Sequence, residues 1–304
     1  MIYNEHYDSL RTDKVLKKID TTTEHTLYEY FTKISNEIPF YFPIDFDFWH
    51  KSMFNECDWT DEEIPLFDKL ETYLYYENEL LKGFIQFGLS GFVLNDNGKD
   101  FNRFYAIIRN IHYSEDSKNP EEMIEKALQF FNERNINEIE AFFHYFGMSC
   151  YARHGKLHES AFYIENLLNK YSFKKVHENI YFSKDLISEE YCCDPEISYK
   201  IQDIDRKMTK MVFFVNNEQI GYCEFTILQN TICYLYNIAI SQKFRGQGWG
   251  IKCMEIIFTV LKKKRIKKID LDTIDTNIVA QNFYTKLGFI NKGITRSYNK
   301  DQEK

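Results

Sequence analysis

A glycine-rich segment, Arg245 to Gly250, most constrains what this chain can fold into. It reads Arg-Gly-Gln-Gly-Trp-Gly and holds three of the 12 glycines of the chain. It follows an apolar run typical of a buried strand, Tyr234 to Ile240, and precedes a helical pattern, Ile251 to Lys264. A strand that enters a helix through such a turn leaves the first helical N–H groups unpaired. These groups and the helix dipole attract phosphate, so the segment predicts a phosphate-bearing ligand.

The same glycines are also compatible with a tight turn that binds nothing. The segment is not a P-loop, because no Gly-Lys-Ser/Thr comes after it, and the acidic residue of a dinucleotide-binding fold is missing. Glycine permits positive φ and close backbone approach, and Arg245 can add a charge-assisted hydrogen bond to an anion. The residues after the helix favour a ligand: a strand is predicted over Lys268 to Asp272, and a second motif runs from Asn277 to Phe289.

Residues from about 195 to 300 resemble a GCN5-related N-acetyltransferase (GNAT) domain. Arg245-x-x-Gly248-x-Gly250 is similar to the loop that holds the acyl-CoA pyrophosphate in that family. The motif from Asn277 to Phe289 is similar to its late helix and the turn into the next strand. The resemblance implies acetyl-CoA as acyl donor, an amine acceptor on a small molecule, peptide or protein, and no metal. It implies that the donor is held by Ile238, Ala239, Ile240, Arg245, Gly246, Gln247, Gly248, Trp249, Gly250, Asn277 and Tyr284.

The composition limits the class of protein. A length of 304 residues allows two domains, and 44% apolar content allows substantial cores. The net charge of −8 argues against nucleic acid or an anionic membrane as the main partner. Seven cysteines without metal-ligand spacing, the lack of a signal sequence and the lack of a long apolar stretch predict a cytoplasmic protein. The oligomeric state is left open.

Internal repeats indicate that the first half of the chain is a diverged copy of the second. The predicted fold is therefore α/β with a mixed sheet: two GNAT-like domains, residues 1–188 and 189–304, each a mostly antiparallel sheet flanked by helices. The repeated features are a hairpin (Thr72 to Tyr76 and Leu80 to Val93; Met211 to Val215 and Gln219 to Leu228), a strand (Asn110 to Tyr113; Asn237 to Ile240) and a turn (Lys170 to Phe173; Lys286 to Phe289). A final strand of the first half is predicted over Asn179 to Phe182.

The first half lacks the features that would bind the donor. In place of the glycine loop it has Asp116 to Glu122, with three acidic residues and with Pro120 at the predicted start of a helix. We expect these carboxylates to repel a pyrophosphate and to occupy the helix N-terminus themselves. Leu168 stands at the position that corresponds to Tyr284. This copy is predicted not to bind CoA in the usual way.

The second half lacks a different feature. GNAT domains usually carry two helices between their first and second strands, where they form a wall of the acceptor site. Here only Asp203 to Lys210 separates the strand Ile197 to Ile201 from Met211. The first half does have such helices, over Thr23 to Ile34 and around Phe48 to Phe54. This predicts a division of labour in which the second half binds the donor and the first half helps to hold the acceptor; the alternative is that the first half only shields an exposed core edge.

Acyl transfer to an amine requires a polarised carbonyl, a proton for the leaving thiolate and removal of the amine's proton. By the resemblance, backbone N–H groups at Ile238 to Ile240 supply the first, where this strand splays from its neighbour. Tyr284 is the candidate general acid. Asn277 either caps its helix or lies beside the pantetheine arm.

The general base is less clear. Tyr234 stands where several family members have a glutamate, and its ordinary pKa near 10 makes it a poor base. Glu224 and Asp272 are the candidates, directly or through a water. The basic run from Lys262 to Lys268 is expected to be solvated at a helix C-terminus, and the alternative is contact with the 3′-phosphate of CoA. Because no base is evident, a non-catalytic acyl-CoA sensor or interaction protein is the alternative to an enzyme; the retained Tyr284 favours the enzyme.

Overall fold

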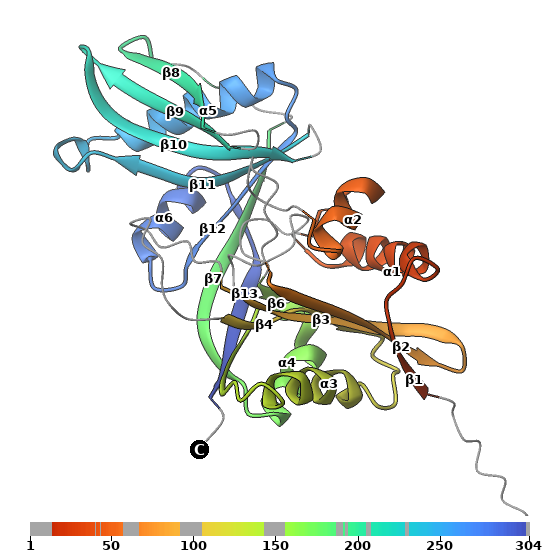
Figure 1. Cartoon of the computed structure of the whole chain (residues 1–304). Coiled ribbons are helices and arrows are strands. Elements are labelled where there is room, and N and C mark those ends of the chain that lie inside the picture. Colours follow the sequence, from red (N-terminus) through yellow and green to blue (C-terminus); the bar gives the residue numbers. More distant parts are fainter. Residues whose placement is uncertain are drawn as a thin grey trace, which may run out of the picture.

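The chain forms one mixed sheet with helices on both faces (Figure 1). The computed structural model describes residues 14–39, 41–42, 44–56, 67–91, 105–142, 156–186, 191, 194–204, 208–228 and 231–301. The predicted end of the first hairpin at Val93 and four of the cysteines (57, 150, 192 and 193) lie outside these ranges. The predicted fold class, a mixed α/β sheet flanked by helices, is confirmed.

The first half builds one wing of the sheet. Its antiparallel strands are β1 (Lys14–Lys18), β2 (Lys69–Glu77), β3 (Leu80–Ser90) and β4 (Tyr105–Tyr113), and β5 (Glu138–Ala141) runs parallel to β4. Its other elements are α1 (Glu24–Glu37), α2 (Phe46–Met53), α3 (Glu121–Asn132), β6 (Leu157–His158), η2 (Glu159–Ala161), α4 (Phe162–Lys170) and β7 (Lys174–Asp185). Both predicted helices before β2 are present, and α3 begins one residue after Pro120.

The second half repeats this order with fewer helices. Its elements are β8 (Ile197–Asp203), β9 (Met208–Val215), β10 (Glu218–Leu228), β11 (Ile232–Ile240), η3 (Gln242–Phe244), α5 (Trp249–Lys263), β12 (Lys268–Ile274), α6 (Ile278–Lys286) and β13 (Ile290–Asp301). The two predicted hairpins turn alike: Asn216 and Asn217, like Asn78 and Glu79, have φ between 49° and 65°, as a tight hairpin turn requires.

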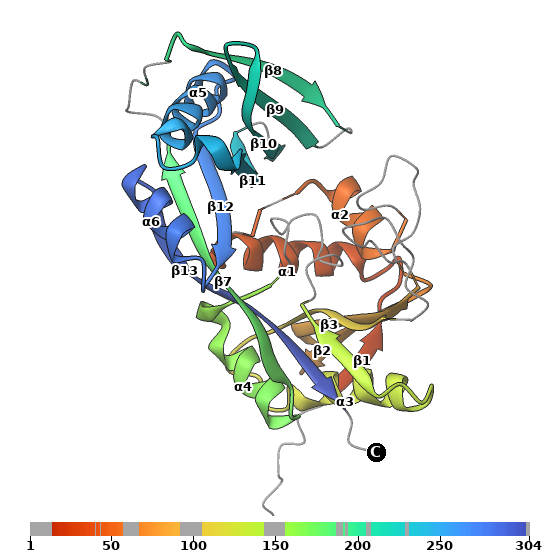
Figure 2. The same ribbon diagram turned by 90° about the vertical axis from the view of Figure 1, so that its left-hand side faces the viewer.

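The two halves exchange their last strands. The strand order is β1-β2-β3-β4-β5-β13-β7-β12-β11-β10-β9-β8. β7, from the first half, pairs with β12 of the second half, and β13, from the second half, pairs with β5 of the first. β7 and β13 also pair with each other and run through both wings (Figures 1 and 2). Strand pairing therefore crosses the predicted boundary between residues 188 and 189, which stays a prediction.

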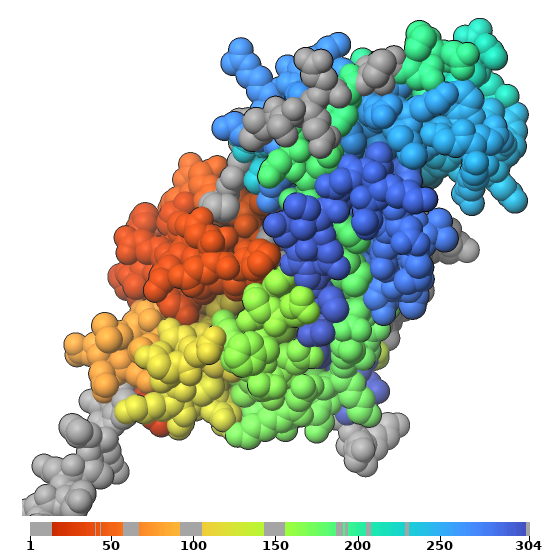
Figure 3. Space-filling model, turned by 180° about the vertical axis from the view of Figure 1, so that it is seen from behind, coloured from red at the N-terminus to blue at the C-terminus, as the bar shows by residue number. Residues whose placement is uncertain are grey.

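Three hydrophobic clusters hold this arrangement together. One lies between the first wing and α3 and α4, and includes Tyr298 of β13. A second lies between the second wing and α5 and α6, and includes Phe182 of β7. The third joins the halves: Leu27 and Trp49, from α1 and α2, share it with Tyr234 of β11. In the space-filling view the red N-terminal segment and the blue C-terminal segment accordingly pack into one body (Figure 3).

The exchange makes the core of the first half depend on β13. Tyr298 is only 1% exposed, and its ring packs against that of Phe142 with the ring centroids 6.4 Å apart. Tyr298→Ala should therefore lower the free energy of unfolding by about 3–5 kcal/mol, as large-to-small changes of buried aromatics do. Hydrogen exchange should show a larger loss of protection in α3 than in α5. Ile290→Ala, at a 60% exposed position of the same strand, is the control and should change little. Equal loss in α3 and α5 would contradict a specific role in the first half.

Candidate functional site

The glycine segment forms a loop that leads from η3 into α5. Gly246 has φ +74° and Gly248, the residue before α5, has φ +85°; an added Cβ at either would meet nothing within 4 Å. Glycine is therefore needed there for its backbone conformation rather than for space. No described residue accepts a hydrogen bond from the backbone N–H groups of Gly246, Gln247, Gly248, Trp249 or Gly250. Such a run of free donors at a helix N-terminus is suited to bind an anion.

Side chains around the loop hold it in shape. The Arg245 Nε donates to the Ile240 carbonyl oxygen at 2.8 Å, which leaves the other guanidinium nitrogens at the exposed loop. Gln247 Nε2 donates to the Lys243 carbonyl oxygen at 2.9 Å, and Trp249 Nε1 donates to Gln247 Oε1 at 3.3 Å. At Gly250 an added Cβ would lie 3.2 Å from the Phe283 ring. Here glycine permits the close approach of α5 to α6.

A free strand edge leads up to this loop. β11 pairs in parallel with β12 only from Ile232 to Tyr234. On its other side β11 stays paired with β10 up to Ile240, with a bulge that leaves Tyr236 without an opposite residue. Ile238, Ala239 and Ile240 are only half-buried. The predicted splay is present, and one edge of β11 from Leu235 to Ile240 has no partner strand within the described chain.

Tyr284 lies on α6, in the hydrophobic cluster against which Ile238 and Ile240 of β11 pack. The Tyr284 side chain is buried, and its ring centroid lies 5.9 Å from that of Phe182 and 5.6 Å from that of Phe289. Burial, and to a lesser degree the charge of Asp272, raises the pKa of Tyr284 to about 12. No described residue forms a hydrogen bond with its hydroxyl. At the start of the helix, Asn277 Oδ1 accepts from the Ala280 N–H at 3.1 Å, so Asn277 is a helix cap.

The candidate bases are both paired. Glu224 Oε1 lies 3.1 Å from the ammonium of Lys210. Asp272 accepts from the Tyr234 hydroxyl at 2.5 Å and from the Asn179 side chain. Burial, followed by the charge of Asp272, raises the pKa of Tyr234 well above its ordinary value, which rules this phenol out as a base. Sequence reasoning missed Lys210 and Asn179, because only the strand register places them beside the carboxylates.

In the first half a side chain fills the place of the anion. Glu77 Oε1 accepts from the Lys118 N–H at 2.7 Å and from the Tyr75 hydroxyl at 2.5 Å, just before α3 begins. Burial acts to raise the pKa of Glu77, but the hydrogen bonds from Tyr75, Lys118 and Asn119 outweigh it and lower the pKa. Of the acidic residues expected at this helix N-terminus, Glu121 and Glu122 do stand in the first turn of α3. The N–H group of Lys118 before the helix is bound by Glu77, which was not predicted.

Two of the three expected acidic residues also pair with lysines. Asp116 pairs with Lys82 at 2.7 Å, and Glu121 pairs with Lys170 at 2.8 Å. Both carboxylates find a lysine within reach, whereas Glu77 is buried on β2 and needs the backbone N–H groups. Sequence spacing did not reveal Glu77, because β3 and β4 lie between it and the loop.

The strand edge of the first half is also filled. All residues of β4 from Ala106 to Tyr113 are buried, in contrast to the end of β11. Arg109 donates to the Ser52 carbonyl oxygen at the end of α2 at 2.7 Å. His112, where β11 has Ala239, has a pKa lowered to about 3 by burial. Leu168 is buried too. The strand end that is half-exposed in β11 is thus covered in β4.

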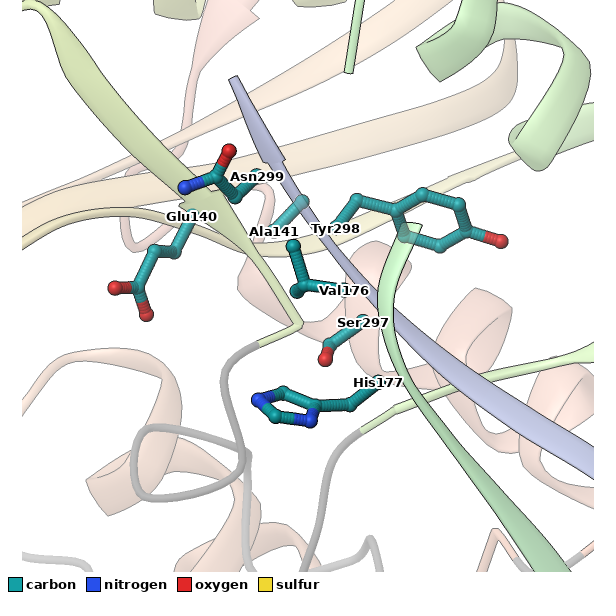
Figure 4. Close-up of a pocket in the computed structure, with 7 residues that line it drawn as sticks. All are labelled: Glu140, Ala141, Val176, His177, Ser297, Tyr298 and Asn299. Carbon is teal, nitrogen blue, oxygen red and sulfur yellow. The ribbon is translucent and has the colours of Figure 1, made fainter. Parts of the chain in front are cut away.

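A pocket of about 200 Å³ lies over β5, β7 and β13 (Figure 4). It contains none of the residues predicted to bind the donor. Its lining residues are Glu140, Ala141, Val176, His177, Ser297, Tyr298 and Asn299. Within the described part of the chain, no group of three or more His, Cys, Asp or Glu side chains is placed to bind a metal ion. None of the described helices combines the length and the hydropathy that a membrane span requires.

Comparisons with known proteins agree on one family. Residues 176–289 match the model of the acetyltransferase (GNAT) family. The [ribosomal protein bS18]-alanine N-acetyltransferase of Haemophilus ducreyi is 28% identical over 83 residues, which are 27% of this chain and 57% of that protein. N-alpha-acetyltransferase 30 of Schizosaccharomyces pombe is 29% identical over 97 residues, 31% of this chain and 58% of that protein. The chain spans little more than half the length of the curated relatives it matches.

Solved structures match over nearly the whole chain. A tandem GNAT protein from the clavulanic acid biosynthesis pathway has a TM-score of 0.66 at 8% identity, over 96% of this chain and 99% of that one. A GCN5-related N-acetyltransferase from Sphaerobacter thermophilus has a TM-score of 0.61 at 7% identity, over 95% of both chains. At these identities the likeness shows the fold, and it supports two GNAT-like halves.

Glu77 should stabilise the protein only while it is ionised. Its pKa is lowered below the ordinary 4.5 in the folded state, so its contribution is present at neutral pH and is lost as the pH falls through the lowered value. Glu77→Gln should cost about 1–3 kcal/mol at pH 7, and the difference from wild type should shrink in denaturant titrations below pH 4.5. The control is Glu79→Gln at the exposed turn next to it. A cost that does not change with pH would contradict the role of the charge.

Proposed function

Because residues 176–289 carry a domain of the acetyltransferase (GNAT) family, we propose that this chain transfers an acetyl group from acetyl-CoA to a primary amine in a ternary complex. The observation that carries the proposal is the free edge of β11 from Leu235 to Ile240, which ends at the unpaired N–H groups of Gly246 to Gly250. An extended arm and a pyrophosphate, covalently linked, fit these two adjoining features in this order.

The donor would lie along β11. Its pyrophosphate accepts from the N–H groups of Gly246 to Gly250, and Arg245 adds a charge-assisted bond. The amides of its pantetheine arm pair with Ile238, Ala239 and Ile240 as an added strand would. Asn277 holds the start of α6 against the arm. Gln247 and Trp249 keep the loop in its shape.

The reaction would proceed by direct attack of the amine on the thioester carbonyl. The nitrogen forms a bond to the acetyl carbon, the C–S bond breaks, and the thiolate leaves with the proton of the Tyr284 hydroxyl. Backbone N–H groups of β11 stabilise the oxyanion. Glu224 is the proposed acceptor of the amine's proton; Asp272, already bonded to Tyr234 and Asn179, is the weaker candidate.

The two halves would divide the work. Only the second half has free donors at its loop, whereas Glu77 closes the first. α1 and α2 lie against the end of the second wing through Trp49 and Tyr234, which supports a role of the first half beside the acceptor. The relatives' names specify a ribosomal-protein alanine and N-alpha amines, which supports an amine acceptor.

The first experiment separates an enzyme from an acyl-CoA sensor. Acetyl-CoA binding is measured by calorimetry, and its consumption is measured against amines, polyamines, aminoglycosides and peptides with free N-termini. Turnover with at least one acceptor supports the proposal. Tight binding of acetyl-CoA without turnover on any of them would refute the enzyme and support the sensor.

Tyr284→Phe tests the general acid. Loss of the hydroxyl should lower kcat by about a hundredfold or more while the Kd for CoA stays close to that of wild type. Since the pKa of Tyr284 is about 12, the group keeps its proton throughout the working range, and kcat should show no alkaline fall from it below pH 10. Tyr171→Phe, which removes a hydroxyl bonded to Glu125 in the first half, is the control. Full activity of the Tyr284 variant would exclude this role.

Gly248→Glu tests the loop. The variant places a side chain at φ +85° and a negative charge at the pyrophosphate site, so the Kd for CoA should rise about a hundredfold or more. Asn135→Glu is the matched control, since it adds the same charge at an exposed position with φ 56° in the first half. It should bind CoA like wild type. Normal CoA binding by the Gly248 variant would refute the loop assignment.

A further inference from the structure

One face of the second wing already holds an ammonium group. Lys210 Nζ on β9 lies 3.1 Å from Glu224 Oε1 and 4.4 Å from the centroid of the Tyr222 ring. A carboxylate beside an aromatic face is the arrangement by which proteins recognise organic ammonium ions. Asn237 Nδ2 donates to the Tyr222 hydroxyl at 3.1 Å and fixes the ring. The three strands thus build a small cation site, and a side chain of the protein occupies it.

This site adjoins the path proposed for the donor. In the β10–β11 ladder Glu224 pairs with Asn237, the residue before Ile238, and Tyr222 pairs with Ala239. The side chains of Glu224 and Tyr222 lie on one face of the sheet, because they are two residues apart on one strand. The cation site is therefore next to the segment of β11 that is free to take the pantetheine arm.

The first half shows what these positions become when helices cover them. By strand register, Thr72, Phe84 and Gln86 correspond to Lys210, Tyr222 and Glu224, since Thr72 pairs with Gln86 and Gly83 with Tyr113, as Lys210 pairs with Glu224 and Gly221 with Ile240. All three are neutral and at most 3% exposed. Gln86 Nε2 donates to the Met53 carbonyl oxygen at the end of α2.

The second half carries charge at the same positions. In the described chain no such helices lie between β8 and β9. The side chains of Lys210 and Glu224 are 30% and 23% exposed. The two copies share a backbone, but this face of the sheet is covered by a helix pair in the first half and carries a bound ammonium in the second.

We infer that Glu224 and the Tyr222 ring form the ammonium subsite of the acceptor, and that Lys210 occupies it until the acceptor displaces it. The inference rests on the proposed function and names its substrate class: a small organic amine that docks as its ammonium form and has no carboxylate beside the amine. An amino acid would bring its own carboxylate next to Glu224, and like charges at this distance repel. A ligand must therefore displace the Lys210 ammonium from Glu224, which favours cationic ligands over neutral or anionic ones.

The test compares Lys210→Met with Lys200→Met. Lys200 lies on β8, on the same face of the sheet as Lys210. Its ammonium is 5.5 Å from the centroid of the Phe214 ring, and it has no carboxylate partner in the described chain. Benzylamine is titrated by calorimetry into each protein saturated with CoA. Removal of the competing ammonium should lower the Kd for benzylamine roughly three- to tenfold in Lys210→Met, and Lys200→Met should match wild type. Phenylalanine, with its carboxylate, should bind no better to wild type than benzylamine does.

A second pair of variants tests the ring. Tyr222→Leu should weaken benzylamine binding several-fold, and Tyr222→Phe should restore most of it, because the aromatic face is retained. An unchanged or higher Kd for benzylamine in Lys210→Met would overturn the inference, since Lys210 would then not compete with the amine. The binding of CoA to the same proteins is measured alongside. If CoA itself does not bind wild type, the proposed function fails; if CoA binds and only the benzylamine shifts are missing, the inference alone fails.

Discussion

The structure depends on the pairing of β7 with β13. These two strands lie at the centre of the sheet, and each completes the wing of the half to which it does not belong in sequence. The exchange reaches the site directly. Phe182 of β7 packs against Tyr284, and Asn179 of the same strand bonds Asp272. The surroundings of the proposed general acid are therefore built in part by the first half of the chain.

The two copies of one backbone pattern differ in how the N–H groups before the helix are satisfied. Both have a strand that splays from its parallel neighbour and a helix that starts after a turn. In one copy the N–H groups before the helix are satisfied by Glu77, and the strand edge is buried. In the other, glycine at positive φ leaves the N–H groups free. A buried carboxylate satisfies the N–H groups of the first loop, and the proposed function gives a pyrophosphate the same role at the second.

Local patterns sufficed to predict most elements and the glycine loop before α5; its assignment to the donor stays a prediction. The glycines of Gly246 to Gly250, the hairpin turn at Asn216 and the helix that carries Tyr284 depend on residues close together in sequence. Long-range pairing was not predictable in this way. The exchange of β7 and β13, the use of Glu77 in place of Asp116, and the pairing of Lys210 with Glu224 all depend on strand register, and register is set by the whole sheet. The charge of Glu224 was visible in the sequence, but its partner was not.

The exchanged strand also has a consequence for how the chain folds as it is made. β5 and the helices of the first half leave the ribosome long before β13, yet Tyr298 of β13 belongs to their core. Until β13 arrives, β5 presents an unpaired edge and the cluster around Phe142 lacks one of its aromatic walls. Unpaired edges and open apolar clusters are the surfaces that chaperones protect during synthesis. The first half is thus the first to appear, yet it cannot be completed before the last strand of the chain is made.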